Sequence, residues 1–196
     1  MGLKVYKADL NCSQISSLLD ADIQDTDKLI AELNSFITGT KNSLTGQAYD
    51  VAREEIESFI PILEQRKISA NEIKNAILSA TSSLSGYMGP YDYLDDSNLE
   101  TLEAEISNIR ASYENIKAEY NEKYNKNFLT KAYLNHELSS LSNQCSSQIA
   151  QLQDEIDKIK GLAGADASAY GCLGNISSSY KSSISNKWNL IGELYG

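Results

Sequence analysis

A break in helical spacing occurs at Gly39-Thr40-Lys41-Asn42-Ser43-Leu44-Thr45-Gly46-Gln47-Ala48-Tyr49-Asp50. On both sides of it, apolar residues recur every three or four positions, which places them on one face of a helix. The break therefore predicts the turn of an N-terminal helical hairpin over about residues 11–66, with Gly39 as a left-handed cap of the first helix. The apolar stripes are Ile15, Leu19, Ile23, Ile30, Leu33 and Ile37, with Thr26 in the gap, and then Leu44, Ala48, Ala52, Ile56, Phe59 and Leu63.

Two Ser-x-x-Glu capping boxes predict further helix starts. The first, Ser69–Glu72, predicts a short third helix over about 69–85, and Pro61 should kink or end the helix before it. Gly86 should end this short helix, and the stretch from Gly86 to Tyr91 is the clearest break in the chain. The second box, Ser97–Glu100, opens a region of long heptad helices over about 97–160.

The heptad region contains one uncertain turn. Residues 121–130 are rich in Asn and Lys without Gly or Pro, so two antiparallel helices are favoured over one very long helix. The glycines between 161 and 174 predict a loop, followed by a C-terminal helix over about 172–193. Strand signals are absent. The stripes are Leu102, Ile106, Ile109, Tyr113, Ile116 and Tyr120; Leu134, Leu138, Leu141, Cys145, Leu152, Ile156 and Ile159; and Leu173, Ile176, Tyr180, Ile184, Trp188 and Ile191.

These patterns predict an all-α fold, an elongated helical bundle of antiparallel hairpins with coiled-coil-like packing, in a single domain over 1–196. The net charge of −10 makes nucleic-acid binding unfavourable. The three cysteines have no spacing that indicates a disulfide framework or a metal pair. No apolar run approaches the roughly 20 residues of a membrane span, and the N-terminus lacks the apolar region of a Sec signal peptide.

No group of residues in the sequence clearly predicts a catalytic or ligand-binding site. His136 is the only histidine and falls toward the polar side of its helix, which favours an exposed structural role. The adjacent carboxylates Glu54-Glu55 and Asp95-Asp96 lack the cleft that a carboxylate pair needs for hydrolysis. No glycine-rich phosphate loop is present. We therefore expect no enzymatic activity, no cofactor, no metal site and no small-molecule substrate.

One tripeptide stands out by its context. Only Leu44-Thr45-Gly46 among five Leu-x-Gly sequences follows the hairpin turn, and Ala48-Tyr49 comes directly after it. Together with the segment Tyr93–Glu100 before a heptad helix, it resembles the LXG domain, the N-terminal targeting region of toxins exported by type VII secretion systems of Gram-positive bacteria. The other four are Leu84–Gly86, Leu162–Gly164, Leu190–Gly192 and Leu194–Gly196.

The resemblance implies a non-catalytic targeting domain. Its partners would be small α-helical WXG100-like proteins, which join it in a hetero-oligomer, and the type VII secretion ATPase. The chain would be cytoplasmic before export and secreted by a non-Sec route. A variable toxin domain follows such domains, so a chain ending at Gly196 would be an excised targeting region or a stand-alone relative.

The resemblance also implies a partner-binding site at Leu44, Gly46, Ala48 and Tyr49. A helix turn without a Cβ at Gly46 would allow another helix to approach closely, with Leu44 and Tyr49 beside the contact. The alternative is that Gly46 only helps the hairpin to pack internally. For the whole chain, the alternative is a self-associating structural coiled coil of a phage or cell envelope. A pore-forming toxin is disfavoured, because it needs a long apolar hairpin.

Overall fold

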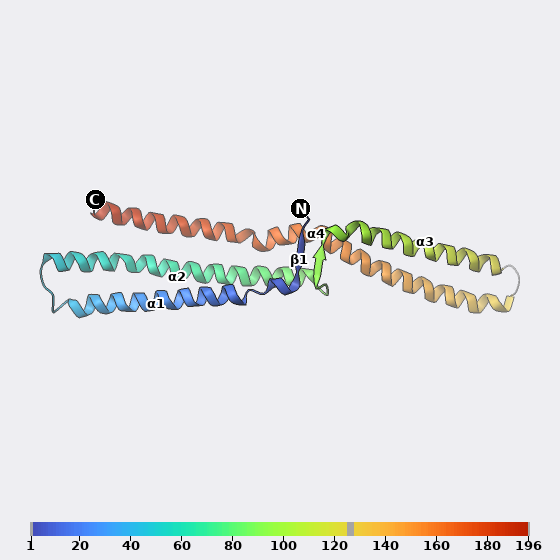
Figure 1. Cartoon of the computed structure of the whole chain (residues 1–196), viewed down its shortest axis with the longest axis horizontal. Helices are drawn as coiled ribbons and strands as arrows, with labels where there is room; N and C mark the ends of the chain where they lie inside the picture. Colours follow the sequence, from blue (N-terminus) through green and yellow to red (C-terminus); the bar gives the residue numbers. More distant parts are fainter. Residues whose placement is uncertain (1, 125–127, 196) are drawn as a thin grey trace. The chain divides into compact units, whose positions relative to one another are not determined.

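The computed structural model of the chain describes residues 2–124 and 128–195. Over these residues, four long helices and one small sheet form (Figure 1), which confirms the all-α prediction. The elements in chain order are β1 (Lys4–Tyr6), η1 (Lys7–Leu10), α1 (Ser13–Thr40), α2 (Gln47–Met88), β2 (Tyr93–Asp95), η2 (Asp96–Asn98), α3 (Leu99–Tyr124) and α4 (Phe128–Tyr195).

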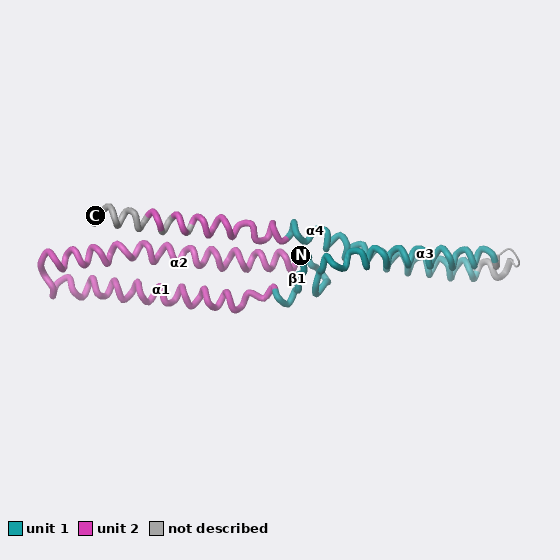
Figure 2. Tube along the Cα trace, turned by 45° about the horizontal axis from the view of Figure 1, so that its top comes forward, with its two compact units in different colours: residues 1–9, 87–165 teal, residues 10–86, 166–196 magenta. Residues whose placement is uncertain are grey.

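The chain divides into two compact units (Figure 2). Unit 1 contains Met1–Asp9 and Tyr87–Ala165, and unit 2 contains Leu10–Gly86 and Asp166–Gly196. Each unit is thus built from two separated stretches, and both α2 and α4 contribute residues to both units. The units are therefore not two consecutive domains, and a single domain over 1–196 stays a prediction.

In unit 2, α1 and α2 form the predicted antiparallel hairpin through a continuous seam of buried and half-buried side chains. Thr26 fills its place in the seam as expected, at 5% exposure, and its hydroxyl donates to the Asp22 carbonyl at 2.7 Å. Ile15 was expected in the seam, but it lies beside it and is exposed, because Ser16 takes the seam position. The seam of α1 is Ser16, Leu19, Ile23, Thr26, Ile30, Leu33, Ile37 and Thr40.

The seam of α2 includes two lysines. Lys67 Nζ lies 2.8 Å from Asp27 of α1, and Lys74 Nζ lies 2.5 Å from Asp20. Long lysine stems cover apolar surface while the ammonium reaches a carboxylate at the edge. The two pairs are one heptad apart on each helix, so they fix the register of the hairpin. The α2 seam is Ile56, Ile60, Leu63, Lys67, Ala70, Lys74, Ile77, Thr81 and Leu84.

The predicted end of the hairpin near residue 66 and the separate short helix over 69–85 are wrong. One helix, α2, runs from Gln47 to Met88 with Pro61 inside it. Pro61 lies at an exposed position of α2, and the helix continues through it. Ser69 is 2% exposed and lies 3.4 Å from the Gln65 side-chain amide, so it is a packed residue and not a cap.

Unit 2 also contains the C-terminal part of α4, which runs alongside the hairpin (Figure 2). Burial, followed by the charges of Cys12 and Asp166, raises the pKa of Tyr170, so this part of α4 lies near the start of α1. α2 has a second line of low exposure besides its seam and is covered on two sides. That line is Phe59, Ile62, Ser69, Ile73, Ala76 and Ala80.

The loop predicted between residues 161 and 174 is also wrong, since α4 is continuous through it. Helix-favouring Ala and Leu residues lie between the glycines, and no proline occurs there. Each glycine costs the helix only about 1 kcal/mol relative to alanine. The predicted stripe of this segment is half-buried at Leu173 and Ile176. Its other members, Tyr180, Ile184, Trp188 and Ile191, lie outside the residues whose side chains are described.

In unit 1, α3 and the first part of α4 form a second antiparallel hairpin. Lys160 lies 2.8 Å from Glu103, and the Tyr120 hydroxyl lies 3.3 Å from Glu137, so sequence positions run in opposite directions. All residues of the two predicted heptad stripes are buried or half-buried. Two separate helices, α3 and α4, form here, as the sequence favoured, and not one very long helix. Residues 125–127 of the predicted turn lie outside the described residues.

The expected absence of strands is wrong for two short segments. β1 and β2 pair antiparallel, with Lys4 opposite Asp95 and Tyr6 opposite Tyr93. Three residues are too few to give an alternating pattern. Asp95 accepts from the backbone N–H of Ser97 at 3.0 Å, so it caps the turn where Ser97 was expected to be the cap.

The break after α2 lies three residues later than predicted. Gly86 is helical, and the helix ends before Gly89, which has φ +63° and is followed by Pro90. The Gly89 carbonyl accepts from Lys7 Nζ at 2.7 Å. The sequence thus indicated the correct stretch but the wrong glycine.

Gly161 and Gly164 give a matched pair of substitutions in α4. A Cβ on Gly161 would overlap the Tyr87 hydroxyl, which donates to the Lys158 carbonyl at 2.9 Å, whereas nothing lies within 4 Å of a Cβ on Gly164. Because both changes gain helix propensity, we expect Gly161→Ala to be less stable than Gly164→Ala by about 1–2 kcal/mol. Urea unfolding followed by circular dichroism measures this difference, and equal stabilities would contradict the contact.

Asp95 should make the attachment of β1 sensitive to acid. Hydrogen bonds from Ser97, together with Lys4, lower the pKa of Asp95 from 3.8 to about 2. A folded-state pKa below the unfolded value stabilises the fold above pH 3.8, and this contribution is lost as the pH falls toward 2. Thermal midpoints of the wild type and Asp95→Asn should therefore converge over that range. Asp92→Asn, an exposed neighbour, is the control and should show no such convergence.

Candidate partner-binding site

The four predicted site residues lie at one end of the α1–α2 hairpin. Leu44 and Gly46 belong to the connection between the helices, and Ala48 and Tyr49 lie in the first turn of α2. Every residue from 41 to 50 is exposed, including the large side chains of Leu44 and Tyr49. The structure therefore brings the four residues together on an accessible surface.

Gly46 lies before α2 and not within it. Its φ is +121°, a conformation that residues with a side chain rarely adopt, and nothing lies within 4 Å of a Cβ built there. The Gly46 carbonyl accepts from the backbone N–H groups of Tyr49 at 2.9 Å and Asp50 at 3.1 Å. Gly46 therefore starts the helix, and no close internal contact within the described chain requires its missing side chain.

Gly39 does not have the left-handed conformation expected of it. It is helical, and α1 continues to Thr40 and ends with a right-handed residue at Lys41. The Thr40 carbonyl accepts from the N–H groups of Ser43 at 3.2 Å and Leu44 at 2.9 Å. These bonds turn the chain without a positive φ, which explains why the glycine at 39 is not used.

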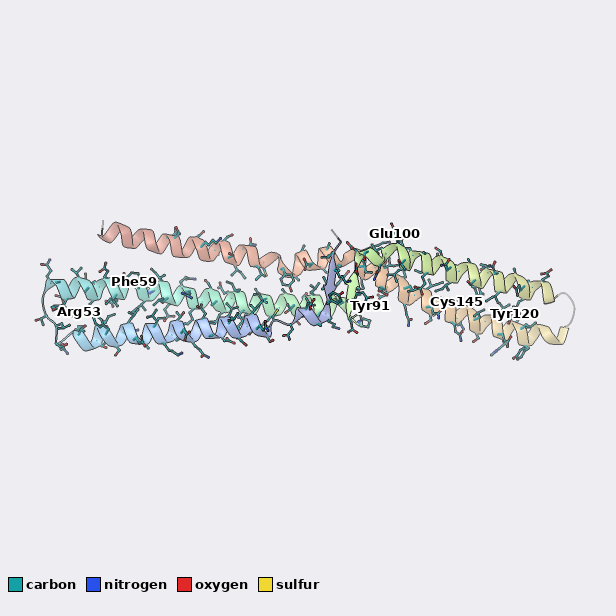
Figure 3. All side chains as sticks on the ribbon, in the orientation of Figure 1. Arg53, Phe59, Tyr91, Glu100, Tyr120 and Cys145 are labelled. Carbon is teal, nitrogen blue, oxygen red and sulfur yellow. The ribbon has the colours of Figure 1, made fainter. Side chains whose placement is uncertain are left out.

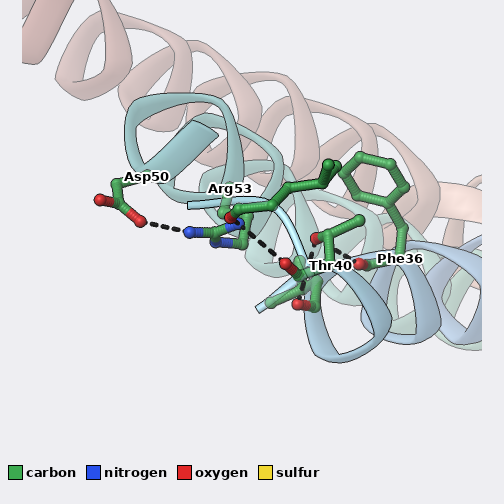
Figure 4. Close-up of polar contacts among 6 residues, drawn as sticks. Phe36, Thr40, Asp50 and Arg53 are labelled. Carbon is green, nitrogen blue, oxygen red and sulfur yellow. Dashed lines mark hydrogen bonds and ion pairs between the residues drawn. The ribbon is translucent and has the colours of Figure 1, made fainter. Parts of the chain in front are cut away.

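Arg53 fastens the end of the hairpin (Figures 3 and 4). Its Nη1 donates to the carbonyl of Thr40 at 3.3 Å and to that of Leu44 at 3.0 Å, and its Nη2 pairs with the Asp50 carboxylate. The side chain of Arg53 is only 12% exposed, and both of its terminal nitrogens are bonded within the protein. This network holds Leu44 and the start of α2 in place.

Exposed apolar side chains also occur along α1. Phe36 lies beside Thr40 and Arg53 (Figure 4) and is exposed. Val51 of α2 is exposed as well. Further large apolar side chains of α1 reach solvent at Ile15, Leu18 and Leu29.

In unit 1, a groove of about 550 Å³ lies around Tyr91. The Tyr91 hydroxyl lies 3.0 Å from Asp154 and 3.1 Å from the Gln151 carbonyl, and burial followed by Asp154 raises its pKa to about 12. Burial, followed by the charge of Glu105, raises the pKa of Glu155 in the same groove. These groups tie the segment after α2 to α4, and we assign them a structural role.

The residues considered in the sequence as catalytic candidates do not come together in one site. His136 and the pair Glu54-Glu55 are exposed, whereas Asp95 and Asp96 hold β1. Within residues 2–124 and 128–195 no group of three or more His, Cys, Asp or Glu side chains could hold a metal ion. No helix in the described part of the chain has the length and apolar character that crossing a membrane requires.

No family model, curated protein or solved structure matches this chain.

Two features of this site were not indicated by the sequence patterns. Arg53 follows the quoted stretch by three residues, and its only signal is the charge pair with Asp50 at helical spacing. The exposed residues of α1 share one helical spacing, but acidic residues interrupt their line. A search for purely apolar stripes therefore passes over it.

Gly46 and Gly39 test where the turn needs a glycine. Gly46→Ala forces a side chain onto φ +121° and should destabilise the chain by about 1–2 kcal/mol. Gly39→Ala changes a helical glycine with no neighbour within 4 Å and should stabilise by about 0.5–1 kcal/mol. Denaturant unfolding of both variants measures the difference, and a neutral Gly46→Ala would refute the role given to this turn.

Proposed function

We propose that this chain is a non-catalytic targeting domain of a type VII-exported LXG toxin, which binds small helical WXG100-like proteins. The observation that carries the proposal is the exposed hairpin end at Leu44-Thr45-Gly46-Gln47-Ala48-Tyr49, the same residues that resemble the LXG signature. In this proposal the partners cover Leu44 and Tyr49, and the complex is delivered to the type VII ATPase. The chain is cytoplasmic before export by this non-Sec route.

The arrangement of polar groups supports a binding role for this end. Arg53 donates hydrogen bonds to the carbonyls of Thr40 and Leu44 and pairs with the Asp50 carboxylate. These contacts order the turn that presents the exposed apolar side chains. Presenting a fixed apolar surface reduces the entropy lost on binding. An exposed apolar surface lowers the solubility of an isolated chain, and a partner that covers this surface restores it.

A self-associating structural coiled coil is the second candidate. The coiled-coil packing of both hairpins favours it, because a third helical face left open on one copy could be covered by another copy. The two candidates differ in the composition of the complex. The first requires a different protein in it, and the second requires only further copies of this chain.

The test is the mass of the complex after co-expression with the small helical proteins encoded beside the gene. We expect a stable heteromer by light scattering, which the double change Leu44→Ser with Tyr49→Ser disrupts. The matched control is Ile68→Ser with Tyr133→Ser, two side chains exposed elsewhere, which should leave the heteromer intact. A homo-oligomer that ignores those neighbours would instead favour the structural coiled coil.

A further inference from the structure

A second line of side chains runs along α1 beside its seam. Its members are separated alternately by three and four residues, as in a coiled-coil contact line. The apolar members are well exposed, with Leu18 at 71% and Leu29 at 43%. We call this the outer line, and it consists of Ile15, Leu18, Asp22, Asp25, Leu29, Glu32 and Phe36.

The outer line faces one side of the hairpin. Four of its members, Ile15, Asp22, Leu29 and Phe36, directly precede seam residues of α1, so they border the seam. Asp22 meets Arg66 across this border, with Arg66 Nε 3.2 Å from the carboxylate. Ile15, Leu18, Leu29 and Phe36 are exposed in the folded chain, so neither α2 nor the C-terminal part of α4 covers them.

Apolar and acidic side chains follow each other in a fixed order along the outer line. Ile15 and Leu18 are apolar, Asp22 and Asp25 are acidic, and Leu29, Glu32 and Phe36 alternate. Asp22 is paired with Arg66, and Asp25 lies 2.9 Å from Lys28 on its own helix. Glu32 makes no hydrogen bond or ion pair with the described residues 2–124 and 128–195. A covering helix must therefore supply apolar contacts and positive charge at different levels.

A second copy of the chain does not meet this requirement. In an antiparallel pair of outer lines, Asp25 faces Asp25 of the copy, and Glu32 faces Leu18. In a parallel pair each acidic residue faces its own equivalent. Like charges opposite each other, or a charge placed against leucine, are unfavourable, and the chain already has a net charge of −10.

We propose that the outer line binds one amphipathic helix of a different protein. That helix has apolar residues facing Ile15, Leu18, Leu29 and Phe36, and Lys or Arg facing Asp25 and Glu32. The inference rests on the proposed function in one respect, that the partner is a different protein. It adds the surface, the helical form of the partner segment and the sign of its charge.

Two synthetic helical peptides test the chemistry without the natural partner. Both have the complementary apolar line over about four heptads. One has Lys at the two positions that face Asp25 and Glu32, and the other has Glu there. We expect the Lys peptide to bind the full chain about tenfold more tightly in low salt, by fluorescence anisotropy, and the difference to shrink as salt is added. Equal binding of the two peptides would overturn the proposal.

Matched variants locate the binding. Leu29→Ser should weaken binding of the Lys peptide at least tenfold, whereas Ile68→Ser, which changes an apolar residue of similar exposure on α2, should not. Glu32→Lys should remove the preference for the Lys peptide, and Glu72→Lys is its control. Equal effects of Leu29→Ser and Ile68→Ser on binding of the Lys peptide would refute the outer line as the binding surface. A dimer of the lone chain that Leu29→Ser abolishes would make a second copy the occupant and also overturn the proposal.

The co-expressed neighbours separate this inference from the proposed function. A heteromer that forms with Leu29→Ser and Glu32→Lys as well as with the wild type keeps the targeting function and refutes the outer line as its surface. If no neighbour binds but the peptides show the expected pattern, the outer line stands and the targeting function fails.

Discussion

The two lysines in the seam of the first hairpin set the geometry on which the rest of unit 2 depends. Lys67 and Lys74 occupy positions that an apolar residue would normally fill, and each reaches one aspartate of α1. A shift of either helix by one turn would leave both ammonium groups without these carboxylates. Each pair is partly exposed and contributes little stability by itself. The pairs select one register, and that register determines which side chains of α1 and α2 remain open to solvent.

Much of the fold follows from the spacing of apolar residues. The seams of α1, α3 and α4 are close to the predicted stripes, because long 3–4 patterns survive local exceptions. The structure differs from these predictions where packing along the seam outweighs a local signal. Pro61 and the Ser69–Glu72 box lie within α2 because the seam continues past them on both sides. The two strands could not be predicted, because residues 4–6 pair with residues 93–95 far away in the sequence. Three residues are too few to give a recognisable strand pattern.

The candidate site shows the same division between local pattern and context. The stretch around Leu44 and Tyr49 does form an exposed turn, but the glycine that the turn needs is Gly46 and not Gly39. Arg53 could not be singled out, since its value comes from carbonyls that the fold brings to it. The outer line is not evident as an apolar stripe, because Asp22, Asp25 and Glu32 interrupt its spacing. The α2 seam shows that charged residues can belong to a contact line, since it includes Lys67 and Lys74.

Because α4 contributes to both units, the two units cannot be completed in the order of the sequence. Its first part completes the hairpin with α3, and its last part joins α1 and α2, which lie far earlier in the sequence. Each hairpin closes a short loop and can form as soon as both of its helices exist, whereas the late part of α4 must close a loop that spans most of the chain. During synthesis, α2 is therefore half of a folded hairpin well before its last neighbour in unit 2 leaves the ribosome. Over that interval the second line of α2, from Phe59 to Ala80, depends on the nascent chain's surroundings for protection from aggregation.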